Sequence, residues 1–365
     1  MRSAVAKRNS PSVIMVSGLH RGESPQAGGA VIESIRQMIP DARFVGISYD
    51  ILESGLFSGG PDAVDAAYLF PYPGTGLDAF MSRLREVHEI EGLSLIVPTL
   101  DSEMMNLITA RTELEKMGIK VAVPSMEALR ARDKPVLGAL ATVVGVPTPV
   151  TLAASTAAEL AAHALQIGYP CYVKGALYDA RLVHTEAQLY AAFADIHAIW
   201  GTPILVQQAV YGEEFVVAGV GDGKGGLLTY CAMRKLLRTK MGKAFGGVSV
   251  DDPLVIDFTR RLISRTHWEG GFEVEFVRPV HDINYLFEIN PRFPAWISFP
   301  TKIGCNMPGY VAASLLGLKP SPPEPCGPGR LFIRHNADLI GDISDLAQLA
   351  TAGVLDGKTQ RYKAV

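Results

Sequence analysis

The first third of the chain alternates short apolar runs with longer amphipathic stretches. The apolar runs are residues 12–17, 43–49, 66–70, 93–98 and 119–125, and the amphipathic stretches are residues 26–38, 77–91 and 102–117. Short runs rich in Val and Ile are typical of buried strands, and the stretches between them have the length of helices. This alternation predicts βαβ units and a parallel sheet.

Two polar loops follow apolar runs of this predicted sheet: "GLHRGE" at residues 18–23 and "PTLDSE" at residues 98–103. Ligands of parallel sheets bind at the carboxyl ends of the strands. The charged residues of these loops are therefore candidates for recognising the charged ends of an amino acid: Arg21, Glu23, Asp101 and Glu103. Helix caps and ordinary turns explain the same residues equally well.

A second pattern begins after the turn-rich joint "GVPTPV" at residues 145–150. Helical stretches at residues 156–165 and 186–200 alternate with strand runs at 169–175 and 203–210, and residues 211–304 are rich in strand patterns. The glycines of "GVGDGKGG" at residues 219–226 resemble a phosphate-binding loop, but a strand pattern follows them, which favours a hairpin turn. The Pro-rich residues 318–329 predict a linker.

The segments "FEVEFV" (residues 272–277) and "YLFEI" (residues 285–289) flank a short polar connection and predict an antiparallel hairpin. A register symmetric about that turn pairs Glu275 with Glu288. Side chains alternate between the two faces of a strand. One face would then carry the polar set Glu273, Glu275, Glu288 and Asn290, and the other the apolar set Val274, Phe276, Phe287 and Ile289.

Carboxylates at directly opposed positions repel each other, because their Cβ atoms lie only about 4.5–5.5 Å apart. Two carboxylates and an amide oxygen suit Mg²⁺, whose coordination the phosphates of a nucleotide can complete. A solvated polar sheet face, or two carboxyl groups that share one proton, explains the same spacing. Arg292 directly follows the strand, where it suits a phosphate or carboxylate ligand or serves as a surface arginine.

Composition narrows the class of protein. The chain has 365 residues, of which 48% are hydrophobic and 19% charged, and its net charge is −3. That length predicts two or three domains. We expect a cytoplasmic protein without a membrane or nucleic-acid partner, because the sequence has no apolar run of roughly 18–20 residues and no basic cluster. The N-terminal residues lack the apolar core of a signal peptide. The four cysteines have no metal-binding spacing, so we expect free thiols.

The pair Glu275-Phe276 followed by "EINPR" resembles the metal-binding end of the ATP-grasp superfamily, particularly its carbamoyl-phosphate-synthetase-like and biotin-carboxylase-like members. Four upstream segments resemble other motifs of the family in the same order: "ARDKPVLGALATVVGVPTPV" (131–150), "IGYPCYVKG" (167–175), "ILVQQAVYGEEFVV" (204–217) and "RKLLRTKMGKAFGG" (234–247). The resemblance covers about residues 132–308.

The resemblance implies an α/β protein with an α+β core: an ATP-grasp fold preceded by a Rossmann-like pre-ATP-grasp domain. We expect that N-terminal domain at residues 1–124 and the small or lid domain at residues 125–208, with a connecting helix at 125–147. The large domain with the metal site would follow at residues 209–320. Residues 321–365 would form a linker and a small C-terminal segment.

The resemblance also implies roles for single residues. The nucleotide would be held by Lys134, Lys174 and Lys235 at its phosphates, by Gln207, Gln208 and Val210 at its adenine, and by Glu214 at its ribose. Mg²⁺ or Mn²⁺ would be bound by Glu275, Glu288 and Asn290. The catalytic residues would be Arg292 and Lys243.

The implied activity is that of a carboxylate–amine ligase. ATP would phosphorylate a small carboxylate to an acyl phosphate, and an amine would displace the phosphate, leaving ADP. An amino acid or a peptide is the expected substrate, and a homodimer is left open. Two alternatives remain: another ATP-grasp enzyme, carboxylase-like or phosphoryl-transferring, and a nucleotide-binding module without catalysis.

Three features depart from the family's pattern. The segment "KGALYDARLV" after Lys174 has one glycine where the family has a glycine-rich loop, which predicts a lid that is short or stiffened by Tyr178, Asp179 and Arg181. Gln207 replaces an acidic residue, and its amide oxygen can still accept from an adenine amino group. Glu273 stands where Asn or Arg is expected, so that either a phosphate contact is missing or a second metal is bound.

Overall fold

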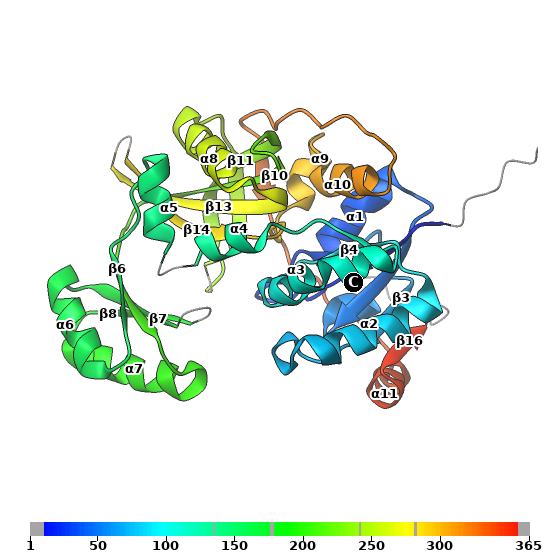
Figure 1. Ribbon diagram of the computed structural model, residues 1–365, viewed down its shortest axis with the longest axis horizontal. Helices are drawn as coiled ribbons and strands as arrows, with labels where there is room; N and C mark the ends of the chain where they lie inside the picture. Colours follow the sequence, from blue (N-terminus) through cyan, green and yellow to red (C-terminus); the bar gives the residue numbers. More distant parts are fainter. Residues whose placement is uncertain (1–10, 134–135, 176–178, 241, 281–282, 357–365) are drawn as a thin grey trace, which may run out of the picture.

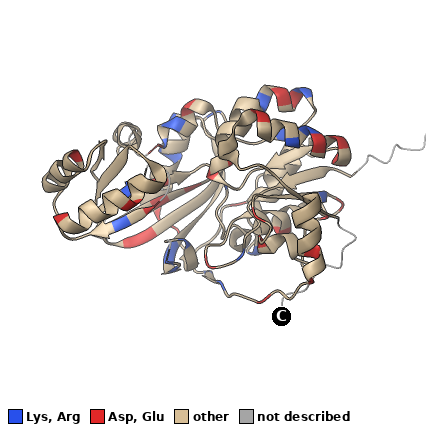
Figure 2. Cartoon of the chain, turned by 90° about the horizontal axis from the view of Figure 1, so that it is seen from below, with Lys and Arg blue, Asp and Glu red and all other residues tan. Residues whose placement is uncertain are grey.

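The computed structural model describes residues 11–133, 136–175, 179–240, 242–280 and 283–356. Within these ranges the strands form three sheets, two of six strands and one of four (Figure 1). No helix in the described part of the chain is long and apolar enough to cross a membrane. Lys and Arg are interspersed with Asp and Glu over the elements seen in Figure 2.

The N-terminal sheet has the order β16-β3-β2-β1-β4-β5, and its first five strands in the chain pair in parallel, as the sequence predicts. Its strands are β1 (Val13–Val16), β2 (Arg43–Ser48), β3 (Ala66–Leu69), β4 (Leu95–Val97), β5 (Lys120–Val121) and β16 (Val354–Asp356). The intervening helices are α1 (Gly28–Met38), η1 (Ser54–Phe57), η2 (Pro73–Thr75), α2 (Leu77–Glu91) and α3 (Asp101–Lys116). The carboxyl ends of β1 and β4 lead into the two polar loops.

The four-stranded sheet has the order β6-β9-β7-β8 and stands at one end of the molecule (Figure 1). It contains β6 (Thr151–Ala154), β7 (Cys171–Gly175), β8 (Ala180–Val183) and β9 (Ile204–Gln208), with α6 (Ala157–Ile167) and α7 (Glu186–Trp200). Thr156 and Thr185 cap these helices by accepting from the backbone N–H three residues on, at Glu159 and Gln188. This unit has a hydrophobic core of its own.

The second six-stranded sheet has the order β14-β13-β10-β11-β12-β15 and is antiparallel. It contains β10 (Glu213–Asp222), β11 (Leu227–Arg238), β12 (Ala244–Ser249), β13 (Glu269–Val280), β14 (Ile283–Asn290) and β15 (Leu331–Ile333). The turn at residues 223–226 joins β10 to β11, which confirms the predicted glycine-rich hairpin. The helices of this region are α4 (Met126–Ala131), α5 (Leu137–Val144), α8 (Pro253–Thr266), α9 (Ser298–Lys302) and α10 (Met307–Leu315).

One hydrophobic core joins the N-terminal sheet to the second six-stranded sheet. It runs from Val16 and Ile32 through Met233 to Trp296 and Met307. Helix α1 lies against α9 and α10 at this junction (Figure 1). We infer that these two sheets behave as one body, because separating them would expose buried apolar surface.

The predicted domain boundaries remain a prediction, but sheet membership adds detail to them. Residues of α5 pack in the core between the second six-stranded sheet and α8, although the boundaries assign this helix to the lid domain. The C-terminal segment also supplies strands to two sheets. It contributes β15 to the edge of one, then α11 (Ile343–Ala352) and β16, which pairs antiparallel with β3.

The β13–β14 hairpin has the predicted register around its polar residues. Glu275 lies opposite Glu288, and Glu273 lies opposite Asn290. The prediction that Phe287 shares the apolar face is wrong, because a bulge after Glu275 shifts the register and pairs Phe276 with Leu286. Leu286 therefore enters the core.

Candidate functional site

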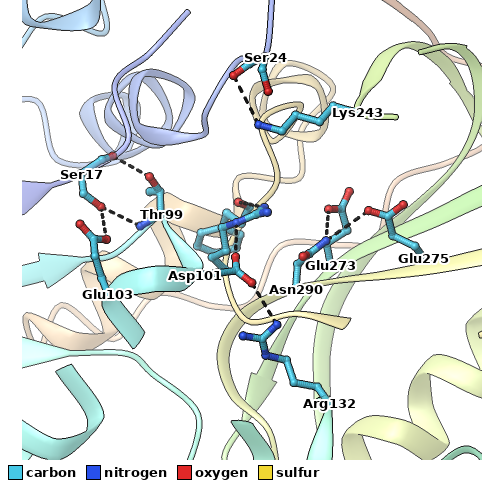
Figure 3. Close-up of polar contacts among 12 residues, drawn as sticks. Ser17, Ser24, Thr99, Asp101, Glu103, Arg132, Lys243, Glu273, Glu275 and Asn290 are labelled. Atoms are coloured by element: carbon cyan, nitrogen blue, oxygen red, sulfur yellow. Dashed lines mark hydrogen bonds and ion pairs between the residues drawn. The ribbon is translucent and has the colours of Figure 1, made fainter. Parts of the chain in front are cut away.

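The polar face of the β13–β14 hairpin forms the centre of the candidate site (Figure 3). The Asn290 Nδ2 amide donates to Glu273 Oε2 at 3.0 Å and to Glu275 Oε1 at 3.2 Å. The Asn290 side chain therefore lies between the two glutamates and relieves part of their repulsion.

Lys235 brings a buried positive charge to these carboxylates. It projects from β11 across β10, and its Nζ lies 2.6 Å from Glu275 Oε2 and 3.3 Å from Glu214 Oε2. Burial lowers the pKa of Lys235, but the attraction of Glu275, Glu273 and Glu214 outweighs burial and raises it. Lys235 therefore stays protonated and places a positive charge beside Glu275.

Glu273 is a buried carboxyl group with two donors. Besides Asn290, it accepts from Trp296 Nε1 at 2.7 Å on Oε1. Burial and the neighbouring Glu275 raise the pKa of Glu273 to about 7, against the opposing effects of Lys235, Arg292 and Trp296. Trp296 thus donates a hydrogen bond to Glu273 in addition to packing in the core.

Arg292 is tied to the N-terminal sheet rather than to the hairpin that precedes it. Its Nε donates to Asp101 Oδ1 at 2.9 Å, and the other oxygen of Asp101 accepts from Arg132 Nη1 at 3.0 Å. Burial lowers the pKa of Arg292, but Asp101, Glu273 and Glu288 outweigh it and raise the pKa. Asp101, the first residue of α3, therefore orients the Arg292 side chain.

Lys243 is a half-buried cation held by backbone carbonyl groups. Its Nζ lies 3.2 Å from the oxygen of Pro25 and 3.4 Å from that of Ser24. Burial and then Arg292 lower the pKa of Lys243 to about 8. Among the described residues, no carboxylate lies within ion-pair distance of its Nζ.

Arg334 is a cation of this site that the sequence did not indicate. It directly follows β15, and its Nη2 donates to the Ala295 carbonyl oxygen at 2.6 Å. Its charge lowers the pKa of Lys243, which indicates that the two cations are close. Burial lowers the pKa of Arg334 as well. Like Lys243, it forms no ion pair within the described part of the chain. Two half-buried cations beside Arg292 favour an anionic ligand.

The residues expected around the nucleotide lie on strands of the four-stranded sheet and of the second six-stranded sheet, and in the loop between β9 and β10. The Lys174 Nζ lies 4.9 Å from the ring centre of Phe287, which the bulge in β14 turns out of the core, and 5.4 Å from that of Tyr172. Lys134 and Tyr178 lie outside the described residues. Strand β7 ends at Gly175 and β8 begins at Ala180.

Gln207 has a buried acceptor without a partner. Its Nε2 donates to Thr151 Oγ1 at 2.8 Å, while its Oε1 is buried and has no hydrogen-bond partner among the described residues. An adenine amino group would satisfy this oxygen. Gln208 pairs with the backbone of Val150, and Val210 lies in the loop that follows β9. Glu214, expected at the ribose, pairs with Lys235 and with Arg238.

Of the four residues predicted to bind the substrate, Asp101 contacts the candidate site through Arg292. Arg21 forms an ion pair with Asp62 and donates to Ser58. Glu23 is exposed, and its Oε1 lies 3.8 Å from Lys240 Nζ.

Glu103 is buried in a network of the N-terminal sheet. It accepts from Ser17 Oγ at 2.6 Å and from Tyr49 OH at 2.5 Å. Burial raises the pKa of Glu103 to about 7. Arg21 and Glu103 are therefore engaged within the protein.

The oxygen atoms on the hairpin are of the kind that bind a divalent cation together with the phosphates of a nucleotide. No group of three or more His, Cys, Asp or Glu side chains with metal-binding geometry is found in the described ranges. Glu275 and Glu288, with the amide oxygen of Asn290, would offer a small set of hard ligands of the kind that Mg²⁺ takes alongside phosphate oxygens. The Lys235 ammonium group at Glu275 indicates that a cation is favoured there.

Comparison with solved structures identifies the fold. Biotin carboxylase of Campylobacter jejuni, solved as a β,γ-ATP complex, superimposes with a TM-score of 0.65 at 16% identity, covering 85% of this chain and 72% of that one. The chain has the ATP-grasp fold. The expected fold class is thereby confirmed.

Two further structures give similar values. L-amino acid ligase of Bacillus licheniformis has a TM-score of 0.64 at 15% identity, covering 84% of this chain and 75% of that one. N5-carboxyaminoimidazole synthetase of Staphylococcus aureus, solved with ADP, has a TM-score of 0.65 at 14% identity, covering 86% and 79%. No family model matches the sequence. At these identities the likeness establishes the fold alone.

Proposed function

We propose that the protein is an ATP-dependent ligase that joins a small carboxylate to an amine through an acyl phosphate, releasing ADP and phosphate. The observation that carries this proposal is the polar face of the hairpin: Glu275 opposite Glu288, with Asn290 beside them and Arg292 at the strand end. A protein that only binds nucleotide has little need of this set. The ATP-grasp fold and its similarity to an amino acid ligase, a biotin carboxylase and a carboxyaminoimidazole synthetase support the same class of reaction.

Each group has a proposed role that its surroundings support. Glu275, Glu288 and Asn290 would hold Mg²⁺, which neutralises phosphate charge when it is bound. Gln207 would accept from the adenine amino group through its unpartnered oxygen, and Lys174 would contact the phosphates. Lys134 is proposed for the phosphates on the resemblance alone.

The cations would recognise the acid and stabilise the charge that develops on it. The Arg292 guanidinium, oriented by Asp101, suits the two oxygens of a carboxylate. Lys243 and Arg334 add two half-buried positive charges that lack a carboxylate partner within the described residues. Such preorganised charges stabilise a transition state more than they would in water. An amino acid or a peptide is the proposed source of the carboxylate.

The proposal is tested by following ADP and phosphate release from ATP and Mg²⁺ with a panel of amino acids, peptides and bicarbonate, alone and in pairs. The mass of the product identifies the bond that is formed. We expect release that depends on one acid and one amine together. Tight ATP binding without turnover for any pair would overturn the proposal. Bicarbonate-dependent turnover in place of an organic acid would replace the amide ligase by a carboxylase-like enzyme.

A further inference from the structure

Three of the four cysteines, far apart in the sequence, meet at the hydrophobic core that the two six-stranded sheets share. Cys231 lies on β11, Cys305 in the turn between α9 and α10, and Cys326 in the Pro-rich segment 318–329. The carbonyl oxygen of Tyr230 accepts from the Cys326 N–H at 3.2 Å and from the Cys305 thiol at 3.9 Å. Because Cys231 is the next residue after Tyr230, all three cysteines surround one peptide group.

The side chains are also near one another. The Cys326 thiol lies close enough to the thiols of Cys305 and Cys231 for the groups to affect each other's protonation. Cys231 and Cys305 belong to the shared core, and Cys326 packs against it. The Cys326 backbone and the Cys305 sulfur thus meet at one carbonyl oxygen, and such neighbouring cysteines are candidates for a disulfide.

Solvent access distinguishes Cys326 from its two neighbours. Cys231 and Cys305 are 0% and 1% exposed, whereas Cys326 is half-buried between the exposed residues Pro325 and Gly327. The Gly327 carbonyl oxygen accepts from Ser249 Oγ at 2.8 Å, which keeps the segment against the sheet. A small reagent therefore reaches Cys326 first. The described cysteines do not have the geometry of a metal site.

We propose that Cys326 and Cys305 form an intramolecular disulfide when a small-molecule disulfide acts on the folded protein. Cys326 attacks one sulfur of the reagent and releases the other half as a thiol. Cys305 then attacks the mixed disulfide at Cys326 and releases the second half. Two electrons pass from the two cysteines to the reagent, and their two protons end on the two released thiols. Cys305 is the partner because its turn adapts more easily than the centre of β11.

The neighbouring Cys326 thiol and then burial raise the pKa of Cys305. The Cys231 thiol and burial raise the pKa of Cys326, against the opposing effect of Cys305. The thiolate is therefore scarce at neutral pH, and the reaction is slower than that of an exposed thiol. The bond would enclose α10 in a covalent ring and fasten the segment that leads to β15 and Arg334. We expect a higher unfolding temperature in the oxidised protein, because the ring restricts the unfolded chain.

The test incubates the folded full chain with oxidised glutathione and counts thiols after denaturation. The count should fall from four to two, and peptide mass spectrometry should find Cys305 joined to Cys326. Cys326→Ser should keep its three thiols. Cys305→Ala should form no disulfide between its own cysteines, and the one thiol it can lose is that of Cys326, as a glutathione adduct. The matched control, Cys171→Ser, should still form the bond. An unchanged thiol count, a stable glutathione adduct on wild-type Cys326, or a bond to a different cysteine would overturn the proposal.

Discussion

Asp101 offers the sharpest test of how the site is oriented. Its carboxylate joins Arg292 of the strand end to Arg132 of the segment before α5, at 2.9 and 3.0 Å, and the Asp101 side chain is 20% exposed. Asp101→Asn keeps the shape and one acceptor but removes the charge. At an effective dielectric constant of about 20, opposite charges about 4 Å apart attract by about 4 kcal/mol. The partial exposure of both pairs reduces the expected loss of unfolding free energy to about 2 kcal/mol.

The expected effect on catalysis is larger than a loss of stability explains. If Asp101 positions Arg292, Asp101→Asn should lower kcat/KM for the carboxylate about 10- to 100-fold, because a small displacement of a transition-state cation is costly. The KM for ATP should hardly change. Activity is measured at a temperature at which the variant remains folded, as checked by circular dichroism.

The matched control is Glu91→Gln, which removes a partly buried carboxylate paired with Arg43 and Tyr68 at the end of α2. It should lose a similar amount of stability and keep its kcat/KM. Equal kcat/KM in wild type and Asp101→Asn, alongside the expected destabilisation, would refute the positioning role and leave Asp101 as a structural tie.

Two further predictions concern single side chains. With a pKa of about 8, Lys243 is about nine-tenths charged at pH 7 and about one-tenth at pH 9, so kcat/KM for the acid should fall as the pH rises through 8. Lys243→Arg should move that limb to higher pH, and an unchanged profile would exclude Lys243 from anion binding. Gln207→Leu should raise the Kd for ATP, measured by calorimetry, about 10-fold. This change corresponds to the loss of one net hydrogen bond of about 1.4 kcal/mol. Wild-type affinity in that variant would place the adenine elsewhere.

Regular patterns made part of this fold predictable. Alternating apolar runs predict the parallel sheet, because each βαβ unit repeats the same periodicity. The pairing of Glu275 with Glu288 agrees with a symmetric hairpin, because the irregularity between Val277 and Val280 compensates for the one after Glu275.

Other features depend on contacts between distant segments, which no local pattern reports. The bulge that turns Phe287 out of the core interrupts the symmetric register after Glu275. Arg334 reaches the site because β15 pairs with β12, more than 80 residues earlier in the chain, through Phe332 and Gly247. Asp101 meets Arg292 through the core shared by two sheets.

The central claim is that the hairpin carboxylates hold the metal on which ATP-dependent ligation depends. The most direct test measures ADP release by Glu288→Gln, with the acid and amine that the substrate panel identifies. We expect a loss of at least about 100-fold, with an unchanged unfolding temperature, because the variant keeps the shape and loses one metal ligand. Turnover at the wild-type rate in the Glu288→Gln protein would contradict the claim.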